Sequence, residues 1–345
     1  MTDKVLSVSV AAYNAEKDIG RCIDSLVGSS VADRLDIIIV NDGSTDDTRE
    51  IAEAYEKQYP GIVRVVNKEN GGHGSTINAG ILAATGKYFR PVDADDWVDR
   101  EGVEKLVHVL EKTEADLVLN PFHVVDAKTM DRINLVQPFL DEKVPEDVRP
   151  GSARTMDETA FLDRVILYMH SVTWRTEVVK RTGPVIDEHC FYVDMEYVLY
   201  PLQYAGTWTY FDFPVYQYLV GTSTQSMNRD NLIRRRDQHL RVTKNLIMFY
   251  ENRKGSFSAG AEVMILHRLR LAVLSQYNIY LNMNPSESRE EIKDFSHWVY
   301  DHFRELTEKP DSRMLQMIEM NRKTGFVFYP AFVKSLNLLH KTPEM

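Results

Sequence analysis

Three carboxylates follow an apolar run in Val92-Asp93-Ala94-Asp95-Asp96-Trp97, and they are well suited to hold a metal ion. The residues Lys87–Val92 have the composition of a strand. Because alternate side chains of an extended chain share a face, we expect Asp93 and Asp95 to point the same way. Oxygen ligands at a strand end suit Mg²⁺ or Mn²⁺, which keep positions open for substrate phosphates. The alternative is a solvated acidic turn before a helix.

Two further loops carry groups that can contact a nucleotide. Asp42 stands where a strand becomes a glycine turn, and its carboxylate can accept a hydrogen bond from a uracil ring flanked by Ala12 and Tyr13. An Asx-type turn explains Asp42 equally well and predicts no ligand. The loop Asn70–Thr76 includes Gly72 and can turn backbone N–H groups toward a phosphate or sugar; a flexible loop is the alternative. It lacks the residues of a P-loop or a dinucleotide fingerprint.

Alternating strand and helix patterns position these loops. We expect strands over Val5–Ala12, Asp36–Val40, Ile62–Val66, Lys87–Val92 and Ala115–Leu119. Helices lie between them, with caps expected at Asn14, at Ser44 paired with Asp47, and at Asp99. This rhythm predicts an α/β fold with a mostly parallel sheet and helices on both faces. Ligands of such sheets bind at the carboxyl ends of the strands, where the candidate loops meet.

The pattern changes after Asn120. We expect a hairpin over Phe122–Val136, a helix from a cap at Asp157 through Tyr168, a helix over Thr176–Arg181, a helix from Met195 into Tyr204 and an aromatic strand over Thr207–Leu219. From about Asp230 onward the pattern is largely helical, so we place a boundary near residue 228.

Composition limits the classes of function. With 43% hydrophobic residues, the 345-residue chain can bury a core, and its net charge of −10 argues against a nucleic-acid partner. A metal would then be the intermediary for any diphosphate ligand. Two cysteines and a start without signal-peptide features predict a cytoplasmic protein. The apolar stretch Val263–Leu281 is interrupted by charged residues, and we expect a buried or interfacial helix there.

Five segments resemble family 2 glycosyltransferases in order, spacing and residue type over roughly the first 120 residues. They are Ser7–Asn14, Ile39–Asp46, Asn70-Gly71-Gly72 through Asn78-Ala79-Gly80, Ala84–Tyr88 and Val92–Trp97. The resemblance implies the GT-A (Rossmann-like) fold. It divides the chain into a GT-A domain over residues 1–228 and a helical C-terminal region over 229–345. Within the domain, residues 1–120 form the nucleotide-sugar half and residues 121–228 the acceptor half.

The resemblance also implies roles for the residues of the loops. Asp95 would bind the metal that bridges the diphosphate, and the nucleotide-sugar would contact Ala12, Tyr13, Asp42, Gly72, Asp93, Ala94 and Asp96. Tyr13 and Asp42 would hold the uridine, Asp93 would face the ribose or sugar, and Asp96 the donor sugar. Thr76-Ile77-Asn78 replaces the Ala-Arg-Asn of many relatives, which puts the donor contact of that Arg in doubt. His73 and Lys87 are the candidate substitutes.

Many inverting relatives carry a Glu-Asp pair below the acceptor, with the Asp as catalytic base. Val193-Asp194 aligns with that pair, so the resemblance implies Asp194 as the base, although the Glu is missing. The alternative is that Asp194 only caps a helix. We interpret His170 and His189 as surface histidines. The segment Thr224–Met227 resembles one that closes over donor phosphates in relatives; an ordinary polar loop is the alternative.

Together these observations predict a metal-dependent, inverting hexosyl- or N-acetylhexosaminyl-transferase. It would move a sugar from a UDP-sugar to a hydroxyl of a glycan or lipid-linked acceptor, in cell-surface polysaccharide synthesis. A catalytically silent sugar-nucleotide or glycan-binding module is one alternative. A sugar-nucleotide pyrophosphorylase is another, disfavoured because the loop after the first strand is not rich in Gly and Arg. The aromatic and basic segment Phe326–Leu339 fits contact with the inner face of the cell membrane, or packing on the catalytic domain or on a second subunit of a homo-oligomer.

Overall fold

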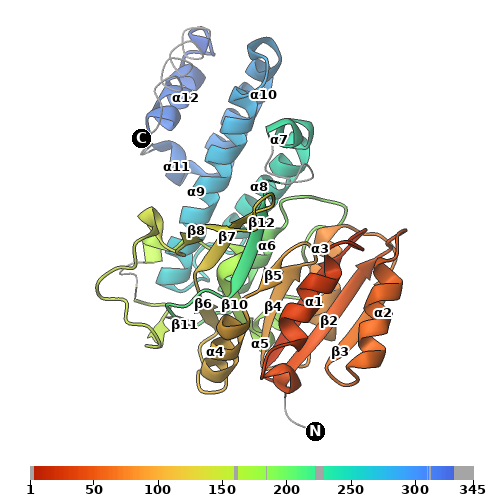
Figure 1. Ribbon diagram of the computed structural model, residues 1–345. Coiled ribbons are helices and arrows are strands. Elements are labelled where there is room, and N and C mark those ends of the chain that lie inside the picture. The colour runs from red at the N-terminus through yellow and green to blue at the C-terminus, as the bar shows by residue number, and fades with distance from the viewer. Residues whose placement is uncertain are drawn as a thin grey trace. The chain divides into compact units, whose positions relative to one another are not determined.

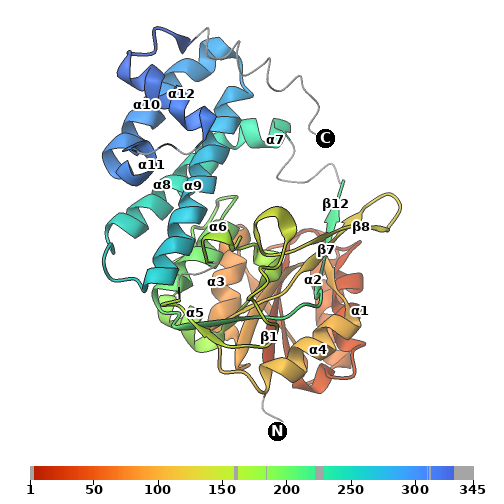
Figure 2. The same cartoon turned by 90° about the vertical axis from the view of Figure 1, so that its left-hand side faces the viewer.

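A computed structural model describes residues 4–158, 162–183, 185–221, 229–308, 310 and 312–329 of the chain (Figures 1 and 2). The chain divides into two compact units. The first comprises residues 1–225 with 256–265 and is an α/β unit, and the second comprises residues 226–255 with 266–345 and is helical in its described part.

The main sheet of the α/β unit has eight strands in the order β3-β2-β1-β4-β10-β6-β11-β9. Its first four strands are all parallel: β1 (Leu6–Ala12), β2 (Leu35–Asp42), β3 (Val63–Lys68) and β4 (Tyr88–Asp93). The remaining four are β10 (Val172–Arg175), β6 (Leu117–Leu119), β11 (Thr207–Tyr210) and β9 (Arg154–Thr155). Strand β10 is antiparallel to both of its neighbours, so the predicted parallel sheet is confirmed for the N-terminal half and becomes mixed beyond β4.

The register of the parallel strands brings the candidate loops to one edge. Ala11 of β1 pairs with Asp93 of β4, and Ala12 pairs with Asn41 of β2. Strands β1, β2 and β4 therefore end at nearly the same level, and the residues that follow them share the carboxyl edge of the sheet.

Helices cover both faces of this sheet, as predicted. The core of one face includes apolar residues of α1 (Ile19–Val27), α2 (Thr48–Gln58) and α4 (Arg100–Leu110), and the other face carries α3 (His73–Ala83) and α5 (Thr176–Thr182) (Figure 1). The helix α1 illustrates the pattern, because Ile19, Cys22, Ile23 and Leu26 are buried at helical spacing.

A second sheet has four strands in the order β5-β12-β7-β8. The predicted hairpin is confirmed as β7 (Phe122–Asp126) and β8 (Arg132–Val136), which are antiparallel. The single strand predicted over Thr207–Leu219 is instead two strands, because Pro214 falls between β11 and β12 (Tyr216–Val220) and cannot donate to a ladder. Strand β12 pairs with β5 (Trp97–Val98), which brings it beside the acidic turn.

Three local predictions were wrong. Asn14 does not cap α1; its Oδ1 accepts the N–H of Thr45 at 2.9 Å and joins the loops after β1 and β2. The helix α2 begins at Thr48 without a cap from Ser44, since Asp46 accepts the Thr48 N–H at 3.1 Å. No α-helix spans the described residues between Asp157 and Tyr168, which include only a 3₁₀ turn. Buried residues alternate there with partly exposed ones, the period of extended chain.

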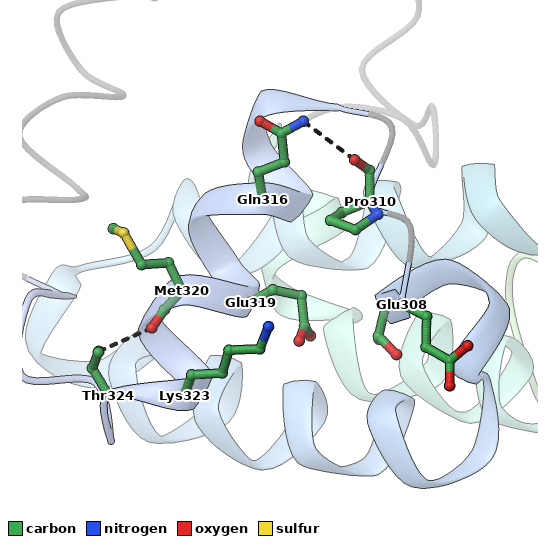
Figure 3. A pocket seen from close by; sticks show the side chains of 8 residues that line it. Glu308, Pro310, Gln316, Glu319, Met320, Lys323 and Thr324 are labelled. Atoms are coloured by element: carbon green, nitrogen blue, oxygen red, sulfur yellow. Dashed lines mark hydrogen bonds between the residues drawn. The ribbon is translucent and has the colours of Figure 1, made fainter.

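The second unit is built from long helices, α8 (Arg236–Glu251), α9 (Ala259–Leu281, beginning in the first unit), α10 (Pro285–His302) and α12 (Arg313–Lys323), with the shorter α7 (Arg229–Arg234) and α11 (Arg304–Glu308). The rings of Tyr277 and Phe295 pack 4.9 Å apart in its core. A pocket of about 430 Å³ in this unit is lined mainly by α12 and the end of α11 (Figure 3). Among the described residues, no helix has the length and apolarity needed to span a membrane.

Candidate functional site

The acidic segment is a turn and not an extended strand. Strand β4 ends at Asp93, and the N–H of Asp96 donates to the Asp93 carbonyl at 3.0 Å. The expectation that Asp93 and Asp95 share a strand face is therefore wrong, because the alternation stops where the chain turns. Asp95 is exposed at the tip of the turn, whereas the side chain of Asp96 returns to the interior and is 1% exposed.

Asp96 anchors the turn to strand β12. The hydroxyl of Tyr216 donates to Asp96 Oδ2 at 2.6 Å, and the N–H of Leu219 donates to Oδ1 at 2.7 Å. Burial, followed by the charges of Asp95 and Asp93, raises the pKa of Asp96 well above its usual value. Asp96 thus holds the second sheet against the turn, and each of its oxygens, which accepts one hydrogen bond, can take one further partner.

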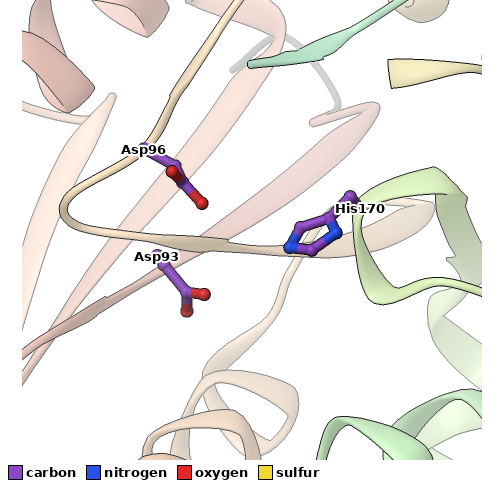
Figure 4. Close-up of side chains that lie close together, drawn as sticks. All are labelled: Asp93, Asp96 and His170. Atoms are coloured by element: carbon purple, nitrogen blue, oxygen red, sulfur yellow. The ribbon is translucent and has the colours of Figure 1, made fainter. Parts of the chain in front are cut away.

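Asp93, Asp96 and His170 form a cluster that fits a divalent cation (Figure 4). One potential ligand atom from each of the three lies within 4.8 Å of the others. Carboxylate oxygens suit Mg²⁺ or Mn²⁺, and a neutral imidazole nitrogen is a common ligand of metal ions in proteins. Burial lowers the pKa of His170 to about 4, so that its ring is neutral at pH 7, and its buried Nδ1 has no hydrogen-bond partner among the residues that the structure describes. The donor types and the unpaired nitrogen fit a metal site.

The prediction that His170 lies on the surface was wrong. It belongs to a 3₁₀ turn, Met169–Ser171, and its ring stacks on Tyr218 with centroids 4.3 Å apart. Sequence reasoning missed this residue because it belongs to no recognisable motif. Its only signal is a position just before β10, the strand that lies beside β4 in the sheet.

A second histidine joins the acidic turn to the glycine loop. His73, the first residue of α3, places its Nε2 2.9 Å from Asp93 Oδ1. Burial opposes protonation, but the charge of Asp93 and this hydrogen bond raise the pKa of His73. Burial likewise opposes ionisation of Asp93, and His73 nevertheless lowers the pKa of that carboxyl.

Asp194 lies within electrostatic reach of His73 and His170. It is the first residue of α6 (Asp194–Leu199), and Val193 occupies the N-cap position. Its negative charge contributes to raising the pKa of His73 and opposes the lowering of the pKa of His170. The catalytic base implied by the resemblance is therefore within electrostatic reach of the acidic turn.

Asp42 organises the glycine loop. Its Oδ1 accepts hydrogen bonds from Lys68 Nζ at 2.7 Å and Gly71 N at 2.9 Å, and also from the Ser75 hydroxyl at 3.1 Å. Its Oδ2 accepts the N–H of Gly72 at 2.8 Å. Because a carboxylate oxygen can accept two hydrogen bonds, Oδ2 retains capacity for a ligand N–H. The carboxylate thus holds the loop, and its contact with a uracil stays a prediction.

The loop before α6 packs on the glycine loop. The N–H of His189 donates to the Gly71 carbonyl at 2.5 Å, and Asn78 exchanges hydrogen bonds with the backbone of Ile186 at 2.9 and 3.3 Å. A Cβ on Gly74 would stand 2.0 Å from the Asp187 carbonyl oxygen, so only glycine permits this approach. Asn78 therefore acts as an internal clamp between the glycine loop and the loop before α6.

The other predicted residues divide into those at the edge and those away from it. Ala12 and Ala94 are buried beside the site, and Tyr13 is 54% exposed at the end of β1, as a base-stacking ring would be. Lys87 does not replace the missing Arg, because it precedes β4 at the opposite edge of the sheet and pairs with Glu114 at 2.7 Å. The segment Thr224–Met227 and most of Phe326–Leu339 lie outside the described residues.

Comparisons with known proteins relate part of the chain to a family of enzymes. Residues 7–162 match the profile of "Glycosyl transferase family 2". An uncharacterized glycosyltransferase of Bacillus subtilis, EpsJ, is 34% identical over 186 residues, which cover 53% of this chain and 52% of EpsJ. The chain thus matches about half the length of this relative, and Asp194 lies beyond the part matched by the family profile.

Solved structures share the fold. The S. aureus TarS fragment 1-349, solved with UDP-GlcNAc, matches with a TM-score of 0.69 at 16% identity, covering 99% of this chain and 93% of that one. The mannosyltransferase PcManGT from Pyrobaculum calidifontis, solved with GDP-Man and Mn²⁺, matches with a TM-score of 0.50 at 14% identity over 99% and 89% of the two chains. At such identities the likeness establishes the fold, which is GT-A.

Proposed function

Because residues 7–162 belong to glycosyltransferase family 2 and the chain has the GT-A fold, we propose that this protein transfers a sugar from a UDP-sugar to a hydroxyl group with the help of a divalent cation. The observation that carries the proposal is the cluster of Asp93, Asp96 and His170 at the carboxyl end of β4. It lies at the same sheet edge as the loop held by Asp42, where a nucleoside diphosphate would bind.

The residues of the turn take different parts. Asp96 positions the turn, since both of its oxygens are bonded to β12. Asp93 and His170 would hold Mn²⁺ or Mg²⁺ together with Asp95, and the Asp96 carboxylate would complete the cluster. Asp95 as a whole residue is exposed, but protein atoms surround its carboxyl and desolvate it. This desolvation, followed by the charge of Asp93, raises the pKa of Asp95 to about 6, and a bound cation would relieve the repulsion. When bound, the cation supplies charge compensation for the diphosphate leaving group.

Asp194 would act as the base in an inverting transfer. The acceptor hydroxyl oxygen attacks C1 of the sugar and loses its proton to the Asp194 carboxylate. The bond between C1 and the diphosphate oxygen breaks, and its electron pair leaves with UDP. One displacement inverts the configuration at C1. His73 would sit between the glycine loop and Asp93, where it can direct a positive charge to the diphosphate that the missing Arg would otherwise contact.

The acceptor and the cellular setting also follow the resemblance. We assign the acceptor to a glycan or lipid-linked saccharide of cell-surface polysaccharide synthesis, made at the cytoplasmic face of the membrane. TarS was solved with UDP-GlcNAc, which supports an N-acetylhexosamine among the first donors to test. Peripheral membrane contact and homo-oligomerisation remain proposals for the C-terminal region.

The test is thermal-shift binding of UDP-, GDP- and TDP-sugars, each with and without Mn²⁺. We expect selective stabilisation by one UDP-sugar in the presence of Mn²⁺, because a ligand that binds only the native state raises its apparent stability. Asp95→Ala should remove the metal-dependent part. If a nucleotide-sugar raised the melting temperature equally with and without Mn²⁺, the role of the metal would be refuted. If no nucleotide raised it, the donor site would be refuted.

A second variant separates catalysis from binding. Asp194→Asn should keep metal-dependent UDP binding and abolish both sugar transfer and UDP-sugar hydrolysis. Loss of binding together with activity would assign Asp194 a structural role. A wild-type protein that binds a UDP-sugar without transferring or hydrolysing it would favour the silent binding module.

A further inference from the structure

A second pocket of about 610 Å³ lies in the α/β unit next to the acidic turn. Its walls come from α1, β5, β8 and the start of α4, and are formed by Arg21, Asp24, Ser25, Trp97, Val98, Asp99, Arg100 and Arg132. None of these residues belongs to the donor site described above. The pocket touches that site at one point, because Arg21 Nη2 donates to the Asp95 carbonyl at 2.6 Å.

Three guanidinium groups and two carboxylates line this pocket in a chain whose net charge is −10. The carboxylates are already engaged. Asp24 accepts the Tyr55 hydroxyl at 2.7 Å, and Asp99 accepts the N–H of Gly102 at 2.8 Å and pairs with Arg132. Arg21 and Arg132 pair with Asp18 and Asp99, so Arg100 is the guanidinium of the pocket that forms no ion pair with the described residues.

The arginines retain donors for a ligand. Arg100 makes a single hydrogen bond, from Nη2 to the Asp24 carbonyl at 3.4 Å, so its Nε and Nη1 donate to none of the described residues. The bonds of Arg21 all come from Nη2, to Asp18 and to the Asp95 carbonyl, which leaves its Nη1 for a ligand. Planar guanidinium groups with two free N–H directions match carboxylate and phosphate oxygens.

An aromatic ring stands among these charges. The guanidinium carbon of Arg21 lies 4.6 Å from the ring centroid of Trp97, which holds both side chains in place. A tryptophan bordered by polar groups offers an apolar surface with a polar rim. Such a surface suits a sugar ring, whose C–H face is apolar and whose substituents are polar.

We propose that this pocket binds an anionic glycan segment, a sugar ring that carries a carboxylate or a phosphate. Arg100 and Arg132 would take the acidic group, and Trp97 would contact the ring. The inference rests on the proposed function, because a glycosyltransferase would use such a subsite to hold a charged acceptor or product chain. Arg21 joins the subsite to the acidic turn through its hydrogen bond to the Asp95 carbonyl, so a ligand that moves Arg21 would change this contact.

The experiment measures binding to the full chain by calorimetry, with UDP and Mn²⁺ present to fill the donor site. The probes are an oligogalacturonate for carboxylate, a phosphorylated malto-oligosaccharide for phosphate, and the unmodified malto-oligosaccharide as the neutral control. We expect one charged probe to bind with an affinity that falls as salt is added, and the neutral probe to bind at least tenfold more weakly. The charged probe that binds identifies the acidic group.

Arg100→Gln is the decisive variant, because Arg100 has one long backbone contact and lies outside the donor site. It should weaken the charged probe about tenfold, the scale of a charged hydrogen bond. Arg49→Gln is the matched control, since Arg49 is a solvent-exposed arginine of α2 whose ion pair within the described part of the chain is with Glu53. Equal binding by wild type and Arg100→Gln, or equal binding of charged and neutral probes, would overturn the proposal.

The two proposals can fail separately. Thermal shift on the same samples reports UDP-sugar binding without reference to the second pocket. Donor binding without binding of a charged glycan would refute the subsite alone. If the charged probe bound while no nucleotide did, with the calorimetry repeated without UDP, the subsite would stand and the proposed transfer would fall.

Discussion

Asp42→Asn tests whether the carboxylate at the end of β2 anchors the glycine loop. The substitution keeps the shape of the side chain and removes its charge. In the native protein this carboxylate is 2% exposed and accepts hydrogen bonds from Lys68, Ser75 and the two N–H groups of Gly71 and Gly72. An asparagine presents one acceptor and one donor group to a site where Lys68 and the N–H groups of Gly71 and Gly72 all donate.

The cost follows from that mismatch. In its best orientation the Asn oxygen takes the place of Oδ1 and keeps the hydrogen bonds from Lys68 and Gly71. Its NH₂ group then faces the Gly72 N–H, which loses its acceptor. A buried N–H left without an acceptor costs about 1–3 kcal/mol, and a neutral acceptor weakens the bond to Lys68 by about 1 kcal/mol more. We therefore expect a loss of about 3 kcal/mol in the free energy of unfolding. For a unit of this size the melting temperature would fall by roughly 6–12 °C.

Urea unfolding followed by tryptophan fluorescence measures this loss in the α/β unit. That unit holds Trp97, Trp174 and Trp208, and the last two are fully buried. Asp131→Asn is the control for the same change of charge, because Asp131 is exposed and its side chain makes no contact that the structure records. It should change the stability by less than 0.5 kcal/mol, as a roughly neutral surface substitution does.

A stability of Asp42→Asn within about 0.5 kcal/mol of the wild type would refute the anchoring role, since surface substitutions commonly fall in that range. If UDP binding were lost at the same time, Asp42 would be a ligand contact and not a scaffold. A large loss of stability with retained UDP binding in the remaining folded protein would give the opposite assignment.

Three further predictions concern other parts of the α/β unit. Asp36→Asn should destabilise the protein at pH 7, with a difference that fades as the pH falls below about 4. Burial opposes ionisation of Asp36, but its hydrogen bonds lower the pKa of this carboxyl in the native state. The ionised Asp36 therefore stabilises the native protein above the pKa of the unfolded state, and this contribution is lost on acidification. Urea unfolding measured across a range of pH checks this. Gly74→Ala should lower the stability by at least about 2 kcal/mol in thermal melts, because the new Cβ would stand 2.0 Å from a backbone oxygen. Gly20→Ala is the control and should leave the stability nearly unchanged, because its Cβ would make an ordinary contact at 3.7 Å. Arg90→Met should weaken Mn²⁺ binding about tenfold in an EPR titration, because buried Arg90 donates to the His170 carbonyl and so positions its ring; unchanged affinity would contradict this.

Local chemistry made the N-terminal half predictable. Four parallel strands, their helices and the cap at Asp99 follow from apolar periodicity and turn residues, and the structure confirms them. The edge at which the loops meet also follows, because parallel strands joined by helices must end on the same side. The sequence by itself therefore located the acidic turn, the glycine loop and Asp42.

Contacts between distant segments decided the rest. His170 reaches the acidic turn because β10 lies beside β4 in the sheet. Asp96 can turn inward because Tyr216 and Leu219 of a later strand donate hydrogen bonds to its buried carboxylate. Periodicity describes how a residue faces its own element, whereas these placements depend on which elements become neighbours. Residue type and spacing thus determined which edge carries the candidate chemistry. Tertiary packing decided which carboxylate anchors the turn, which stays exposed and which histidine joins them.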